Sequence, residues 1–371
     1  MKKILLTILA VLAMSGMAMA QTAPSDINLH RNEDGSWSFI MPGRNLVMSI
    51  ETFSTNDTVN GHYLAGVPEG WLILALGDTV PVSNDSLRRT TPITEGTPVT
   101  IVPTGNLRAI KSITLIDVPL PAGVIAGLFS VSATQQVYFS QGNLQATTTD
   151  SGSTWTWSFA TNQYDYVGNA VANNAINGNG TVSTNGTVDL FGWSTASNSN
   201  GIHNSSSSSV YSGDFVDWGN NAIANGGNTV NSGWRTLTKD EWVYLFSTRT
   251  DAASKYGHGK VNGVNGVIIL PDEWTLPSGL SFTAGNTNWG NVYTLEQWAQ
   301  MEAGGAVFLP AEGSRTGASF SNVGSRGYYR TSTASDWEEA YTLYFRYELV
   351  EPQNNAYRYR GYCVRLVRDN N

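Results

Sequence analysis

Apolar residues come in short runs along this chain, and Gly, Pro, Asn and Asp separate one run from the next. In the first third of the sequence, these runs lie at residues 36–40, 46–53, 71–76, 99–102 and 110–116. Residues 36–40 alternate between polar and apolar positions, as a half-buried strand does, whereas residues 71–76 are wholly apolar. Several short strands with turn residues between them are typical of a β-sandwich. We therefore predict an all-β domain over residues 22–120.

A second domain is expected after a proline-containing linker. Residues 118–123 include two prolines in a spacing that suits neither a helix nor a central strand. Beyond the linker, strands are expected at residues 129–131, 137–139, 306–309, 340–347 and 362–367. The Gly-, Asn- and Ser-rich residues 169–231 are expected to form long surface loops. Together with two helices, these strands predict an α+β domain with a small antiparallel sheet over residues 124–371.

The two helices are marked by capping boxes at their first residues. Thr238 precedes Glu241 and Thr294 precedes Gln297, and this spacing lets each threonine and its partner satisfy backbone N–H groups reciprocally. Apolar residues follow each box at helical spacing, namely Trp242, Leu245 and Phe246 in the first helix and Trp298 and Met301 in the second. We predict that these apolar residues face the core.

Charge and targeting signals narrow the possible functions. The 371 residues carry a formal net charge of −8, and no Lys or Arg occurs from residue 112 to residue 234, so we expect no nucleic-acid partner. Lys2 and Lys3, an apolar stretch at residues 4–14 and an Ala-Met-Ala cleavage site at residues 18–20 form the pattern of a signal peptide over residues 1–20. No later apolar run is long enough to span a membrane. We predict an exported protein that is periplasmic, on the cell surface or extracellular.

Motifs for catalysis or metal binding are absent from the sequence, and no cofactor is expected. The single cysteine, Cys363, cannot form an intramolecular disulfide, and we interpret it as a buried, unreactive thiol. His258, Glu312 and Asp336 are the residues on which an alternative reading as a divergent hydrolase or oxidase depends. That reading requires the three side chains to meet in one pocket.

Tyrosine and arginine are concentrated at the C-terminal end. Residues 315–371 hold eight of the fifteen arginines and eight of the sixteen tyrosines. Both residue types are enriched at the energetic centres of protein interfaces. Alternation along residues 341–348 predicts that Tyr341, Leu343 and Phe345 are buried and that Thr342, Tyr344, Arg346 and Glu348 are presented to solvent. The alternative is that these tyrosines and arginines simply stack along an exposed strand pair without a ligand.

Four sequence phrases, read in order, resemble one protein family. They are WRTLTKDEW at 234–242, AVFLPAEGSR at 306–315, GYYRTST at 327–333 and GYCVRLV at 361–367. The set resembles the C-type-lectin-like fold of formylglycine-generating-enzyme relatives. It is more similar to secreted gut-bacterial proteins of that type, which include variable proteins diversified by retroelements. The resemblance covers about residues 124–369 and implies a C-type-lectin-like fold there.

The resemblance also implies where a ligand binds. The enzyme branch uses a pair of cysteines, and Cys363 stands alone, so that activity is not implied here. In the variable proteins, ligand-facing positions follow the phrase that reads RTST at 330–333 in this chain, where Arg330 replaces the usual tryptophan. The implied ligand-binding residues are Arg330, Trp337, Glu338, Tyr344, Arg346, Glu348, Asn355, Tyr357 and Arg360.

The sequence therefore predicts an exported, non-catalytic binding protein with an immunoglobulin-like β-sandwich and a C-type-lectin-like domain. Its partner is expected to be a protein or a carbohydrate at the cell surface. Two alternatives remain open at this point, the divergent secreted enzyme and a surface component that assembles with its own copies.

Overall fold

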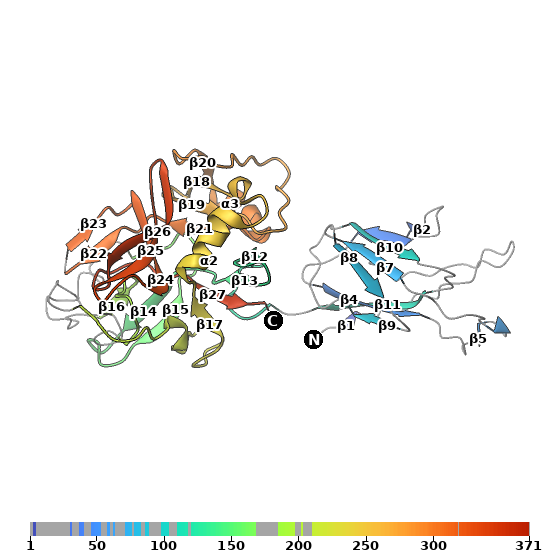
Figure 1. Ribbon diagram of the computed structural model, residues 1–371, viewed down its shortest axis with the longest axis horizontal. Coiled ribbons are helices and arrows are strands. Elements are labelled where there is room, and N and C mark those ends of the chain that lie inside the picture. The colour runs from blue at the N-terminus through green and yellow to red at the C-terminus, as the bar shows by residue number, and fades with distance from the viewer. Residues whose placement is uncertain are drawn as a thin grey trace. The chain divides into compact units, whose positions relative to one another are not determined.

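The computed structural model describes residues 120–370 apart from 168–184, 197–201, 203–209 and 318, and before residue 120 it describes the strands alone. The chain divides into two compact units, Met1–Leu120 and Pro121–Asn371, called here the N-terminal and the C-terminal unit (Figure 1). Among the described residues, no helix is long and apolar enough to cross a membrane.

The N-terminal unit contains two main antiparallel sheets, with strand orders β1-β11-β4-β9 and β2-β3-β10-β7-β8. Figure 1 shows them as two layers, and the short strands β5 and β6 pair separately. The strands are β1 Lys3–Ile4, β2 His30–Arg31, β3 Trp37–Ile40, β4 Leu46–Thr52, β5 Thr58–Val59, β6 His62–Tyr63, β7 Trp71–Ala75, β8 Asp78–Val82, β9 Ser86–Arg88, β10 Pro98–Pro103 and β11 Ile110–Asp117. Each of the five apolar runs expected to be a strand is one.

Part of the predicted signal peptide is paired in this unit. Strand β1 lies inside it and pairs with Leu115 and Ile116 of β11. The other residues of the predicted signal peptide lie outside the described part of the chain.

The C-terminal unit is a mixed structure with several small sheets rather than the one small sheet expected from the sequence. The sheets have the strand orders β12-β13-β27-β17, β15-β14-β16, β20-β18-β19-β21, β22-β23 and β24-β25-β26. The strands are β12 Phe129–Ser130, β13 Gln136–Phe139, β14 Leu144–Thr148, β15 Thr156–Phe159, β16 Gly186–Val188, β17 Trp234–Thr236, β18 Tyr256–Val261, β19 Val264–Ile269, β20 Asn291–Tyr293, β21 Val307–Pro310, β22 Ser314–Thr316, β23 Ser319–Ser321, β24 Arg326–Ala334, β25 Glu339–Arg346, β26 Leu349–Tyr357 and β27 Leu366–Asp369. Strand β27 pairs with β13 and β17, so the last strand of the C-terminal unit lies beside one of its first strands.

Both predicted helices are present, and both capping boxes are formed. Helix α2, Lys239–Val243, begins after Thr238 and continues as a π-helical turn, η4 Tyr244–Thr248. Helix α3, Leu295–Ala303, begins after Thr294. Short 3-10 turns lie at η3 Trp218–Asn220 and η5 Ala252–Ser254. Both helix predictions are confirmed. They could be made from the sequence because a capping box is a local signal that is recognised without knowledge of distant contacts.

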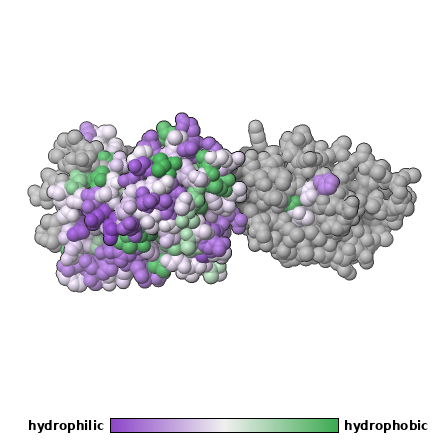
Figure 2. Space-filling model, turned by 90° about the horizontal axis from the view of Figure 1, so that it is seen from above, coloured by the Kyte–Doolittle hydropathy of each residue, from purple (hydrophilic) through white to green (hydrophobic). Residues whose placement is uncertain are grey.

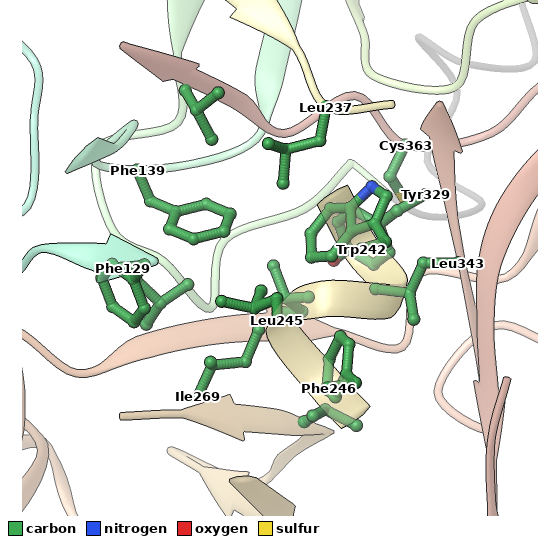
Figure 3. Close-up of a cluster of buried hydrophobic side chains, with 14 of the residues drawn as sticks. Phe129, Phe139, Leu237, Trp242, Leu245, Phe246, Ile269, Tyr329, Leu343 and Cys363 are labelled. Carbon is green, nitrogen blue, oxygen red and sulfur yellow. The ribbon is translucent and has the colours of Figure 1, made fainter. Parts of the chain in front are cut away.

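The largest core of the C-terminal unit surrounds α2 and η4 (Figure 3). Trp242 and Leu245 lie on the helical segment and pack among residues of β12, β13, β19, β24 and β25. Tyr329 of β24 and Leu343 of β25 belong to this core, so one face of the sheet β24-β25-β26 rests on it. A second core contains Phe191 and Trp218, which anchor the described parts of the Gly- and Asn-rich region. The core therefore supports one face of the sheet β24-β25-β26.

Candidate ligand-binding surface

The predicted ligand-binding residues lie on or beside the antiparallel sheet β24-β25-β26. In the strand register, Arg326 pairs with Arg346, and Glu339 pairs with Tyr357. Both pairings are interrupted by irregularities, between Arg330 and Ala334 and between Thr342 and Tyr344. The sheet offers two turns to solvent, one between β24 and β25 and the other between β25 and β26.

Eight of the nine residues divide between the two ends of this sheet, and the ninth, Arg330, lies within β24. Trp337 and Glu338 form the β24–β25 turn, and Asn355 and Tyr357 lie beside it at the end of β26, with Arg360 just beyond. Arg346 and Glu348 lie at the β25–β26 turn, with Tyr344 two residues before Arg346. At about 3.3 Å per residue, the seven steps from Glu339 to Arg346 separate the two ends by about 23 Å.

Seven of the nine side chains reach solvent. Trp337 is 67% exposed and Tyr357 is 38% exposed. Arg346, Glu348 and Asn355 are exposed as well, and Glu338 and Arg360 are half-buried. The exposed large hydrophobic residues of the described C-terminal unit thus include an aromatic ring at each end of the sheet, since Tyr347 beside Arg346 is 48% exposed.

Tyr344 is buried rather than presented, in contrast to the simple alternation of the sequence. It is 8% exposed, and its ring stacks on Tyr328 with ring centroids 4.9 Å apart. Tyr328 stacks in turn on Tyr362, at 4.7 Å and an interplanar angle of 7°. Tyr362 comes from the segment after β26, and its ring covers the face of the sheet that alternation assigns to solvent. Of the residues expected inside, Leu343 and Phe345 are buried and Tyr341 is half-buried.

Arg330 also lies beneath the surface, with 1% exposure. Its guanidinium stacks 4.5 Å from the Tyr362 ring centre and donates to the carbonyl oxygens of Phe191, Arg358 and Arg360. Burial lowers the pKa of Arg330 to about 9, so it stays charged at neutral pH. Its contacts hold irregular backbone together, and in this structure its side chain is not available to a ligand.

The β24–β25 turn, which carries Trp337, is fixed from both sides. The Asp336 carboxylate accepts hydrogen bonds from the N–H groups of Glu338 at 2.8 Å and Glu339 at 2.7 Å, and these bonds lower the pKa of Asp336. Arg358 donates to the carbonyl oxygens of Asp336 and Glu339, and its guanidinium lies 4.2 Å from the ring centre of Trp193. Arg358 is not among the residues expected to bind a ligand, because no local pattern in the sequence shows that its side chain reaches the β24–β25 turn.

The β25–β26 turn is held by contacts to the loop before β20. The Nδ1 and Nε2 atoms of His258 lie 2.9 Å from the carbonyl oxygens of Asn286 and Arg346, respectively. The Glu348 N–H donates to the Thr287 carbonyl at 2.8 Å, and Glu348 has a left-handed φ of 64°. Burial lowers the pKa of His258, whereas the two carbonyl oxygens favour its protonated form. His258 therefore connects the β25–β26 turn to the loop before β20.

The residues of the alternative enzyme reading have separate partners. His258 contacts two backbone carbonyls, and Asp336 lies in an exposed turn. Glu312 is fully buried, with its Oε2 atom 3.1 Å from the Sγ atom of Cys363, and burial raises the pKa of both side chains well above their usual values. A protonated thiol is a poor nucleophile. Within the described ranges, no group of three His, Cys, Asp or Glu side chains is arranged to hold a metal ion.

No family model, curated protein or solved structure matches this chain. The resemblance carried by the four sequence phrases therefore stays a prediction.

Proposed function

We propose that this protein is an exported, non-catalytic binding protein whose ligand, a protein or a glycan, contacts the exposed ends of the sheet β24-β25-β26. In this proposal the C-terminal unit has a C-type-lectin-like fold and the N-terminal unit an immunoglobulin-like sandwich fold. The leader at residues 1–20 directs export to the periplasm, the cell surface or the medium.

The observation that carries the proposal is the exposure of Trp337 on a turn that is held rigid. A side chain with 67% exposure gains little from the protein's own core, so its burial energy is available to a partner. Asp336 and Arg358 fix the backbone on both sides of it. A pre-ordered aromatic residue binds with a smaller loss of conformational entropy than a mobile one.

The surroundings of Trp337 suit a mixed polar and aromatic contact. Tyr357 is stacked on Tyr359 with ring centroids 5.1 Å apart, and the Arg360 guanidinium lies 5.7 Å from the Tyr357 ring centre. On the face of the C-terminal unit drawn in Figure 2, hydrophobic residues are scattered among hydrophilic ones rather than joined into one area. A specific protein interface usually contains aromatic residues and arginine that are surrounded by a polar rim.

Binding of the purified 21–371 protein to surface-protein and glycan arrays tests the proposal. We compare the Trp337→Ala and Tyr357→Ala variants with Val292→Ala, a matched control on β20 with 61% exposure. Loss of a central aromatic contact should weaken binding about 30-fold or more without lowering the melting temperature. The control should bind as the parent protein does.

Two results would contradict this function. Unchanged binding by the folded Trp337→Ala and Tyr357→Ala variants would place the ligand elsewhere. Concentration-dependent self-association in sedimentation, abolished by Trp337→Ala, would instead support assembly with further copies of the chain.

A further inference from the structure

Two arginines face each other across β24 and β25 at the end of the sheet opposite Trp337. Arg326 and Arg346 are direct partners in the antiparallel register, so their side chains leave the same face of the sheet. That face is also the one on which Tyr328 and Tyr344 stack. Like charges placed directly opposite each other destabilise a strand pair, and the fold nevertheless keeps them together.

Within the ranges that the structure describes, neither arginine forms an ion pair with an acidic side chain. Two acids lie close in the chain, Glu348 in the adjoining turn and Glu351, the register partner of Tyr344. In the described part of the chain, neither acid forms an ion pair within 4.0 Å of Arg326 or Arg346, and Glu351 accepts a hydrogen bond from Asn354 instead. An uncompensated pair of cations is unexpected in a chain with a net charge of −8.

The groups that these two arginines offer to a ligand are N–H donors. Arg346 donates to the Tyr347 carbonyl at 3.1 Å, and the neighbouring Tyr328 and Tyr344 hydroxyl groups raise the pKa of Arg326, that of Tyr328 most. A guanidinium has five N–H donors and no acceptor, and a tyrosine oxygen that accepts from arginine still has its own O–H to donate. A ligand group that accepts from every side, such as a carboxylate, matches this arrangement.

We infer that Arg326 and Arg346, with the hydroxyl groups of Tyr328 and Tyr344, bind a carboxylate from an acidic segment of a protein partner. This inference rests on the proposed binding function and adds Arg326, which the sequence analysis did not include. A protein is favoured over a sugar because the arginine pair and Trp337 lie about 23 Å apart. One protein surface covers both ends of the sheet at the size of an ordinary interface.

The test measures binding of a fluorescent hexaglutamate peptide to the purified 21–371 protein, with hexaglutamine as the neutral probe and a hexameric uronic acid oligosaccharide as the acidic sugar probe. The variants are Arg326→Gln, Arg346→Gln and Arg346→Lys. Arg368→Gln on β27 is the matched control, since it removes the same charge from a half-buried arginine elsewhere. Thermal melting of each variant verifies that it is folded.

The parent protein should bind hexaglutamate but not hexaglutamine, and more weakly as the salt concentration rises from about 20 to about 200 mM. Arg326→Gln and Arg346→Gln should each weaken binding roughly tenfold or more, Arg346→Lys should lose less, and Arg368→Gln should bind as the parent does. Absence of hexaglutamate binding, or equal binding by all variants, would overturn the carboxylate site. Binding of the uronic acid probe alone would overturn the choice of a protein partner.

This experiment fails independently of the array experiment. If hexaglutamate binds through the two arginines but the arrays show no dependence on Trp337, the proposed function is wrong and the carboxylate site stands. If the arrays show that dependence but hexaglutamate does not bind, the reverse holds.

Discussion

Replacement of Glu312 by glutamine shows whether this buried carboxyl group holds a proton in the folded protein. Glu312 is 0% exposed, and its two oxygens contact the Asn143 amide and the Cys363 thiol, neither of which carries a charge. Arg365 donates to Asn143 at 3.4 Å, and no ion pair links it to Glu312. Burial, reinforced by the nearby Asp189, raises the pKa of Glu312 well above its usual 4.5.

The size of the effect follows from proton linkage. In the unfolded chain Glu312 ionises near pH 4.5, whereas in the folded protein it keeps its proton to a higher pH. Folding therefore takes up a proton in this range, and the free energy of unfolding falls by about 1.4 kcal/mol for each pH unit. Glutamine has nearly the same shape and does not ionise, so Glu312→Gln removes this slope.

Urea denaturation of the parent protein and Glu312→Gln at a series of pH values measures this difference. Above about pH 5.5, the variant should gain on the parent by about 1.4 kcal/mol per pH unit until the folded pKa is passed. Glu312→Ala separates shape from charge, since the cavity and the unpaired Asn143 should cost about 2–5 kcal/mol relative to Glu312→Gln at every pH. A parent-to-glutamine difference that does not change with pH would refute the reasoning.

Three further outcomes distinguish supporting residues from contact residues. Tyr344→Ala should lower the free energy of unfolding by about 3–5 kcal/mol, measured by urea denaturation, because its ring is buried against Tyr328. Arg358→Gln should increase hydrogen exchange of the backbone amides around Trp337, because the turn loses two donors. Acidification below about pH 6.5 should destabilise the parent protein more than His258→Gln, since the folded state resists protonation of His258. Equal pH dependence of the two proteins in thermal melts would contradict this last expectation.

The parts of the fold that follow from local signals were predictable from the sequence. The five apolar runs of the N-terminal unit are the strands β3, β4, β7, β10 and β11. Helices α2 and α3 begin where the capping boxes place them, and Trp242 and Trp298 are buried. These features depend on residues within a few positions of one another, so a single sequence is sufficient to recognise them.

The candidate site was only partly predictable, because alternation along one strand does not show what covers its outer face. Tyr344 alternates with buried residues and was expected at the surface, but Tyr328 and Tyr362 stack over that face. Tyr362 lies eighteen positions beyond Tyr344, and no local pattern shows that its segment folds back onto the sheet. Conversely, Trp337, a position that only the family resemblance indicated, is 67% exposed in a turn, and its role in binding stays a prediction.

The arginines of the C-terminal end serve two different purposes, since some are buried and bind backbone carbonyl groups and others lie outside the core. The sequence shows how many arginines there are but does not separate the two groups. Of the eight arginines after residue 314, four are buried, namely Arg315, Arg330, Arg358 and Arg365. Each of the four donates to backbone carbonyl oxygens of segments distant in the chain. In a unit with many irregular segments, carbonyl groups lack strand partners, and a guanidinium with five donors satisfies several of them at once. The signal for binding is therefore not the number of arginines but an arginine outside the core that forms no ion pair within the described residues. The half-buried Arg326 and the exposed Arg346 fit that description, whereas the buried Arg330 does not.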